Sequence, residues 1–207
     1  DLHRVDRRQR QMCIRERCTF SHDQIDLNFK DPLVLIEFIE IVLLLLSKGV
    51  TTFRLDAVAF IWKKNGTSCV NLPETHEIVK LLRLIVNYIN PHALIVTETN
   101  LPRKENLSYF GNNDEANWIY NFPLPPLILY TFLFEDSSKI SGWSKSMPPA
   151  QINNAYLNFI ASHDGIGMRP AEGILDNIIL DKLFKRVKKN GGKFSFRKVE
   201  SKNKVYE

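Results

Sequence analysis

The stretch Phe53-Arg54-Leu55-Asp56-Ala57-Val58 says more about the fold than any other part of this 207-residue chain. Residues 50–55 have the composition of a β-strand, and we expect that strand to end at Asp56. Residues two apart on a strand point to the same face, so the guanidinium of Arg54 should lie beside the carboxylate of Asp56 and favour its ionised form. Such a carboxylate is a candidate nucleophile, although an Arg-x-Asp pair by itself is more often a structural ion pair.

Outward from this stretch, segments with helical and strand patterns alternate. Asp31-Pro32 has the composition of a helix start, with Asp as the N-cap and Pro in the first turn. The continuous apolar run Ala93–Thr97 is typical of a strand buried on both faces of a parallel sheet, and it ends at Glu98. Helices are predicted over residues 31–47, 73–90, 123–134 and 176–189, and strands over residues 50–56, 93–97, 116–122 and 155–161.

Repeated βα units predict an α/β protein with a parallel sheet covered by helices, either doubly wound or closed as a (β/α)8 barrel. Three acidic residues follow the C-terminal ends of predicted strands: Asp56, Glu98 and Asp164. They favour the barrel, because barrel enzymes assemble their sites at that face. A full barrel takes roughly 250 residues, and only about four strands are recognisable, so we predict a partial TIM barrel.

Three carboxylates at one barrel mouth suit retaining glycoside chemistry, in which one attacks the anomeric carbon and another protonates the departing oxygen. Asp56, beside Arg54, suits the nucleophile. Glu98 has no neighbouring cation in sequence and suits the acid/base, with a pKa raised by burial and by the other carboxylates. Asp164 with His163 could bind sugar hydroxyls and stabilise the transition state. Taken singly, Glu98 could instead be an acid at a helix N-terminus, and His163-Asp164 a loop cap or a metal ligand.

Composition and charge argue against several classes of function. The net charge of +5 comes mainly from the two ends, and the balanced middle shows no alternation of basic and aromatic residues, so we expect no nucleic-acid partner. Three cysteines, Cys13, Cys18 and Cys69, form an odd set without metal-ligand spacing. They predict a reduced, cytoplasmic protein with no metal site. The apolar run Ile41–Leu46 is too short to span a bilayer, so no membrane partner is expected.

The two ends of the chain differ from its middle. Residues 1–18 are rich in arginine, lack apolar periodicity, and include a stretch, Arg8–Arg15, that resembles a translated sequencing adaptor. We expect residues 1–18 to be foreign to the fold or disordered, and residues 19–207 to form a partial catalytic barrel domain. The start at Asp1 and the end inside a charged stretch predict a piece of a larger protein.

Several segments together resemble the α-amylase family of glycoside hydrolases (family 13), and more narrowly its sucrose phosphorylase branch, which includes sucrose-6-phosphate and glucosylglycerate phosphorylases. The resemblance covers the chain from residue 19 onward and rests on Gln24–Asn28, Phe53–Val58, Gly66–Cys69, Thr97–Asn100, Tyr109–Asn112, Tyr120–Pro126 and Phe159–Gly167. It implies Asp56 as nucleophile, Glu98 as general acid/base and Asp164 as transition-state stabiliser. It also implies that Arg54 and His163 contact glucose.

The same resemblance implies a reaction in which inorganic phosphate attacks a glucosyl ester on Asp56 and gives α-glucose 1-phosphate, with no cofactor. Gln24 matches a position at the mouth of the active site. Starch-degrading relatives usually carry Lys-His where this chain has Ala59-Phe60, and Asn where it has Ser162. Both changes indicate a small sugar substrate such as a disaccharide. The resemblance implies inorganic phosphate as the second partner.

The catalytic trio leaves other functions open. A retaining α-glucosidase or an amylosucrase-like transglucosidase would use the same residues, and some amylase-like barrels are non-enzymatic partners of membrane transporters. The resemblance implies that the first strands, the last strand, the phosphate-binding loops and a C-terminal domain lie outside this sequence. We therefore expect the 207-residue chain alone to be an inactive, poorly folded fragment with exposed strand edges. The leaving group and the oligomeric state stay open.

Overall fold

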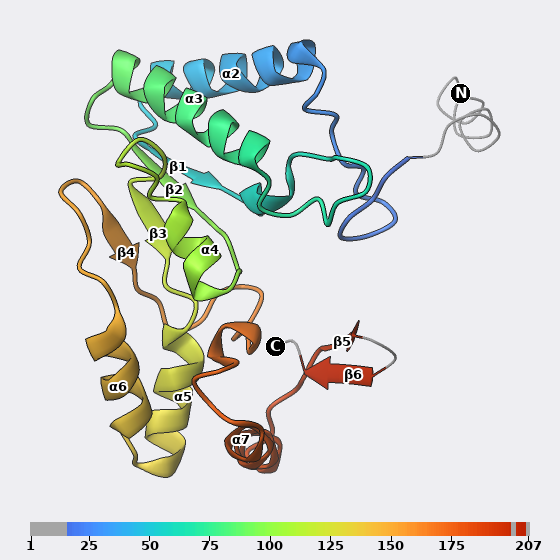
Figure 1. The fold of residues 1–207 in the computed structure, drawn as a ribbon, viewed down its shortest axis with the longest axis vertical. Helices are drawn as coiled ribbons and strands as arrows, with labels where there is room; N and C mark the ends of the chain where they lie inside the picture. The colour runs from blue at the N-terminus through green and yellow to red at the C-terminus, as the bar shows by residue number, and fades with distance from the viewer. Residues whose placement is uncertain (1–15, 200–201, 206–207) are drawn as a thin grey trace.

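The computed structural model describes residues 16–199 and 202–205 (Figure 1). Within these residues one sheet contains the strands β1 (Thr52–Leu55), β2 (Leu94–Thr97), β3 (Trp118–Tyr120) and β4 (Ala155–Leu157). The helices are α2 (Pro32–Ser47), α3 (Pro73–Ile89), α4 (Arg103–Ser108), α5 (Leu124–Phe134), α6 (Ser138–Ser146) and α7 (Asn177–Lys189). A separate antiparallel pair is formed by β5 (Phe196–Val199) and β6 (Lys202–Val205).

The four strands of the main sheet are parallel and lie side by side in their order along the chain. Leu55 pairs with Thr97 across β1 and β2, and Tyr120 pairs with Leu157 across β3 and β4. A doubly wound sheet would reverse this order at a switch point, whereas a (β/α)8 barrel adds every strand on the same side. The chain therefore forms an arc of a barrel, as predicted. Among the described residues, β1 and β4 each have a strand partner on one edge only.

The predicted bounds of α2, α3, α5 and α7 are confirmed to within one residue, and a side-chain cap fixes the start of two of these helices. The Asp31 carboxylate accepts a hydrogen bond of 3.0 Å from the Leu33 amide at the start of α2. The Asp176 carboxylate accepts one of 2.8 Å from the Ile179 amide at the start of α7. These bonds satisfy backbone donors that have no partner inside the helix.

Two apolar cores support the arc. The first lies between the sheet and the helices α2 and α3, which run side by side in Figure 1, and its buried side chains include Phe53, Val79, Leu82, Val86, Ile95 and Ile119. The second lies among α5, α6, α7 and the short helical turn Arg169–Ala171, and includes Leu127, Tyr130, Trp143 and Leu183. Each fully buried side chain of this kind contributes roughly 1.5–3 kcal/mol, so the first core gives β1 and β2 a rigid base.

The strands are shorter than predicted. Beyond β1, Ala57 takes a left-handed conformation, with φ of 44°, and turns the chain into the short helix Val58–Phe60. Beyond β3 and β4, the Asn121 side chain donates to that of Asn158 at 2.8 Å. The Asn121 amide also donates a 3.0 Å hydrogen bond to the Leu157 carbonyl, so the two segments stay paired one residue beyond β3 although the strands are shorter than predicted. The helices α4 and α6 and the β5–β6 pair were not predicted, because these segments are polar or charged and have no clear apolar periodicity.

The predicted boundary at residue 18 stays a prediction, because residues 1–15, including Cys13, lie outside the described part of the chain. Arg17 does contact the following segment: its carbonyl accepts a 2.9 Å hydrogen bond from the Asp26 amide. Cys18 and Cys69 are free thiols. Within residues 16–199 and 202–205, no helix has both the length and the apolar character needed to cross a membrane.

Candidate active site

Arg54 and Asp56 stand at the C-terminal end of β1 and form the predicted ion pair. Arg54 Nη1 lies 2.6 Å from Asp56 Oδ1. The Nε of the same guanidinium donates a 3.1 Å hydrogen bond to the Tyr120 hydroxyl at the end of β3. Arg54 is therefore fixed from two sides, and it holds the carboxylate of Asp56, whose side chain is 73% exposed, at the mouth of the arc.

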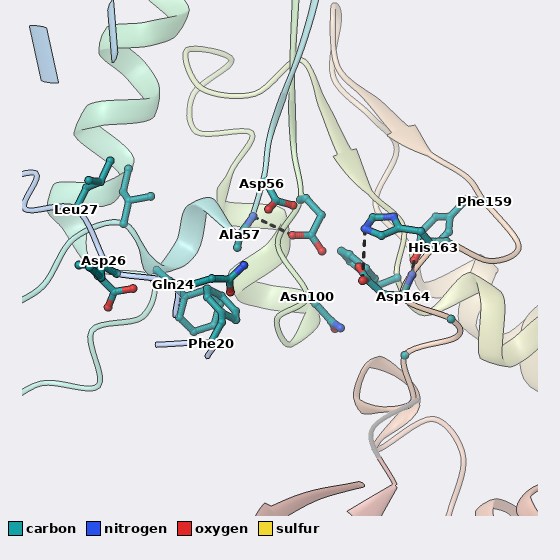
Figure 2. A pocket seen from close by; sticks show the side chains of 18 of the residues that line it. Phe20, Gln24, Asp26, Leu27, Asp56, Ala57, Asn100, Phe159, His163 and Asp164 are labelled. Atoms are coloured by element: carbon teal, nitrogen blue, oxygen red, sulfur yellow. Dashed lines mark hydrogen bonds and ion pairs between the residues drawn. The ribbon is translucent and has the colours of Figure 1, made fainter. Parts of the chain in front are cut away.

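Glu98 follows β2, directly beside the end of β1. Its Oε2 accepts a 3.0 Å hydrogen bond from the Ala57 amide, the residue after the candidate nucleophile (Figure 2, dashed line from Ala57). Burial raises the pKa of Glu98, and the nearby charges of Asp56 and Asp164 add to that shift, while Arg54 and the Ala57 amide oppose it. The predicted direction and its cause are confirmed, and a carboxyl with a raised pKa is what a general acid requires.

His163 and Asp164 reach the site from a loop rather than from a strand end, because β4 stops at Leu157. The two side chains face each other, with 3.4 Å between His163 Nε2 and Asp164 Oδ1, and they are 76% and 60% exposed. The loop is closed by reciprocal backbone hydrogen bonds between Ser162 and Gly165, and the Ser162 hydroxyl accepts a 3.2 Å bond from the Asp164 amide. Ser162 thus shapes the turn that presents Asp164.

One pocket of about 860 Å³ joins these groups. Asp56, Glu98, Asp164, His163 and Gln24 all line it, so it gathers every predicted site residue except Arg54, which acts on Asp56 from beside the pocket. In Figure 2, Gln24 reaches in from the N-terminal segment on one side, the His163–Asp164 pair lies on the other side, and Asp56 stands between them. Within the described residues no group of three or more His, Cys, Asp or Glu side chains is placed to bind a metal ion.

Aromatic side chains line the pocket and were not predicted as site residues. Phe122 and Phe159 meet edge to face, with 5.5 Å between ring centres, and Tyr120 stacks on Phe122 at 5.5 Å. On the opposite wall, Phe20 meets Phe60 edge to face at 5.2 Å. These contacts join residues that are far apart in sequence, and single aromatic residues on a strand or loop carry no signal that separates a pocket lining from a core.

An ion pair and a hydrogen bond join the N-terminal segment of the pocket to the loop around Lys63. Lys63 Nζ lies 3.1 Å from Asp26 Oδ2 and donates a 2.9 Å hydrogen bond to the Thr19 hydroxyl. These contacts hold the N-terminal segment, which carries Gln24, against the loop that follows Asp56.

Asn100 also lines the pocket, two residues after Glu98. Its place in the Thr97–Asn100 segment was the only sequence signal for it.

Residues 11–165 match the sequence model described as the catalytic domain of alpha amylase. The chain belongs to the alpha-amylase family. This confirms the predicted family, and it agrees with the strand order of a partial barrel.

The chain is similar to glucosylglycerate phosphorylases. That of Spirochaeta thermophila is 47% identical over 189 residues, which are 91% of this chain and 32% of the relative. That of Escherichia coli is 43% identical over 174 residues, which are 84% of this chain and 31% of the relative. This chain therefore spans about a third of the length of these relatives. The solved structure of sucrose 6F-phosphate phosphorylase from Thermoanaerobacter thermosaccharolyticum matches with a TM-score of 0.76 and 24% identity, over 91% of this chain and 37% of that one, which shows a shared fold.

Proposed function

We propose that this chain carries the catalytic centre of a glycoside phosphorylase, which transfers an α-glucosyl group from a small glucoside to inorganic phosphate with retention of configuration. The observation that carries the proposal is the pairing of β1 with β2, which puts Asp56 and Glu98 on neighbouring strand ends. Neighbouring strands lie about 4.8 Å apart, which suits the short carboxyl separation of about 5–5.5 Å in retaining enzymes.

The surroundings of the two carboxyl groups support different roles. Asp56 is exposed in the pocket and paired with a guanidinium, so it can serve as the nucleophile. Glu98 is half-buried, and desolvation raises its pKa, so it can hold a proton for the leaving oxygen. Two carboxyl groups whose environments differ in this way are the usual basis for assigning an acid and a nucleophile.

In the first step, an Asp56 oxygen forms a bond to the anomeric carbon while the bond from that carbon to the aglycone oxygen breaks. Glu98 gives its proton to the departing oxygen and becomes a carboxylate. Asp164 stabilises the positive charge that develops on the sugar ring, His163 binds the glucosyl group, and Arg54 holds the Asp56 carboxylate in place. Because Phe122 and Phe159 line the pocket, we assign them to the apolar faces of the sugar.

In the second step, an oxygen of hydrogen phosphate attacks the anomeric carbon and the ester bond to Asp56 breaks. Glu98 takes up the proton that phosphate gives up, which restores both groups and releases α-glucose 1-phosphate. Relatives named glucosylglycerate phosphorylase, up to 49% identical to this chain, make glucosylglycerate the first donor to test.

The proposal is tested with the protein in its full native length. Glucosylglycerate, sucrose and sucrose 6F-phosphate are each supplied with and without phosphate, and glucose and glucose 1-phosphate are measured. We expect phosphate-dependent release of glucose 1-phosphate from at least one donor. Glucose released at the same rate without phosphate would instead support a glucosidase, and the absence of any product would support a non-enzymatic role; either result overturns the proposal.

A further inference from the structure

A buried polar network lies behind the candidate active site, outside the pocket. His76, in the first turn of α3, has Nδ1 2.7 Å from Oε2 of Glu115 and Nε2 3.2 Å from Oδ1 of Asn71. The Glu115 side chain is 4% exposed and that of His76 16%. Buried polar groups that satisfy one another in this way lock the segments that carry them into one arrangement.

Packing confirms that this arrangement is tight. The His76 ring stacks on the fully buried ring of Tyr109, with 4.5 Å between ring centres. Gly111, whose φ is 55°, lies so close to Glu115 that a β-carbon there would come within 2.9 Å of Glu115 Cγ. The network therefore lies beside two segments named in the sequence analysis, Gly66–Cys69 and Tyr109–Asn112. Neither segment has a role in the proposed reaction.

The network reaches the catalytic groups through two backbone hydrogen bonds. The Asn71 amide donates a 2.8 Å bond to the Ala59 carbonyl, within the short helix that follows the nucleophile. At the start of the same turn, the Ala57 amide donates to Glu98. Asn71 and Ala57 both have positive φ, 54° and 44°, and such a backbone persists in residues other than glycine only where the surroundings hold it.

We propose that Asn71, His76 and Glu115 are positioning residues, which hold the turn Ala57–Phe60 so that the Ala57 amide stays on the Glu98 carboxyl. The network acts at a distance and does not touch the substrate. The inference rests on the proposed roles of Asp56 and Glu98, because it assigns the network to the alignment of those two groups.

Loss of the network has a distinctive consequence. The groups that act on Glu98 are Arg54, Asp56, Asp164 and the Ala57 amide, and the amide lowers its pKa. If the turn loosens and this bond is lost, the pKa of Glu98 rises further. The protonated form of Glu98 then persists to higher pH. In a plot of kcat/KM against pH, the fall in rate on the alkaline side therefore moves to higher pH; we call this fall the alkaline limb. A change that only destabilised the fold would leave this limb in place.

The test uses three variants of the full-length protein. N71G removes the side chain that meets His76, while glycine accepts the positive φ; H76Q and E115Q alter the other two members. H92Q is the matched control, because His92 is exposed in the turn before β2. The pH profile is measured as glucose 1-phosphate formation from the donor that supports it, because the aglycone oxygen of that donor takes the proton of Glu98 as it departs. Fluoride release from α-glucosyl fluoride, with and without phosphate, is measured beside it and reports on the nucleophile whatever the natural donor is. Hydrogen exchange of the peptide over residues 56–60 reports on the turn without any activity.

We expect kcat to fall roughly tenfold to a hundredfold in the three variants, while KM changes less than about threefold. The alkaline limb of the pH profile should move to higher pH, and the amides of residues 56–60 should exchange faster. H92Q should match the wild type.

Unchanged kcat, alkaline limb and hydrogen exchange in all three variants, even with a lower melting temperature, would overturn the inference. Fluoride release without glucose 1-phosphate from any donor would instead count against phosphorolysis alone. If the wild type shows no activity, unchanged exchange overturns the positioning role and faster exchange supports it.

Discussion

The two halves of the candidate site are held in different ways. Asp56 and Glu98 follow paired strands, and each has a partner at hydrogen-bond distance: the Arg54 guanidinium at 2.6 Å and the Ala57 amide at 3.0 Å. His163 and Asp164 lie on a loop six and seven residues beyond the end of β4 at Leu157 and meet at 3.4 Å. The groups that would make and break bonds directly follow paired strands, while those that would bind the sugar and stabilise its charge are on a loop.

This difference has a physical reason. A nucleophile and an acid must keep their geometry within a fraction of an ångström, which strand ends and close hydrogen-bond partners provide. Groups that bind sugar hydroxyls can complete their hydrogen bonds when the substrate arrives. We therefore expect substitutions on the β1–β2 side to act mainly on kcat, and those on the His163–Asp164 side to act on binding as well.

The largest expected effect is that of Asp56→Ala. It removes the group to which the glucosyl ester is assigned, so kcat should fall by about 10⁴-fold or more. The measurement is glucose 1-phosphate formation by the full-length protein. Asp181→Ala on the exposed face of α7 is the matched control and should keep wild-type activity. More than a few per cent residual activity in Asp56→Ala would remove Asp56 from the role of nucleophile.

Glu98→Gln should come next, with a loss of about 10²- to 10⁴-fold. Glutamine keeps the shape of the side chain and can still accept from the Ala57 amide, but it cannot give a proton to the leaving oxygen. The defect should be smaller with α-glucosyl fluoride, because fluoride leaves without a proton. Equal losses with the natural donor and with the fluoride would contradict the acid role and leave Glu98 a structural group.

Asp164→Asn tests the loop side of the comparison, with an expected loss of about 10²- to 10³-fold. The negative charge of Asp164 helps to raise the pKa of Glu98. Its removal should lower that pKa, so the alkaline limb of the residual activity should move to lower pH, opposite to the shift expected for H76Q. A limb that stays where it is in the wild type would show that Asp164 does not face Glu98.

The smallest effect is expected for Tyr120→Phe, which keeps the aromatic stack with Phe122 but removes the hydroxyl that accepts from Arg54 Nε. Loss of a hydrogen bond to a charged group costs about 1.5–3 kcal/mol, which corresponds to a loss of roughly tenfold or more in kcat/KM. Phe159→Leu serves as the comparison for lost aromatic surface. If Tyr120→Phe has wild-type kinetics, the guanidinium is positioned by Asp56 alone.

The order of elements could be predicted because it depends on local signals. Asp31 and Asp176 cap their helices, and the apolar run before Glu98 is a strand, as expected. The ends of β1 and β4 could not be predicted, because the contacts beyond them join residues that are distant in the sequence. The left-handed turn at Ala57, after β1, places its amide on Glu98, and Asn158, just after β4, contacts Asn121.

The sequence alone determined the α/β class, the candidate trio of Asp56, Glu98 and Asp164, and the ion pair between Arg54 and Asp56, because neighbours on one strand share a face by geometry. Tertiary structure decided the order of the strands within the sheet, the position of His163 and Asp164 on a loop, and the aromatic and buried polar contacts around the site. Those properties arise from contacts between residues distant in the chain, and no local pattern of residues encodes them.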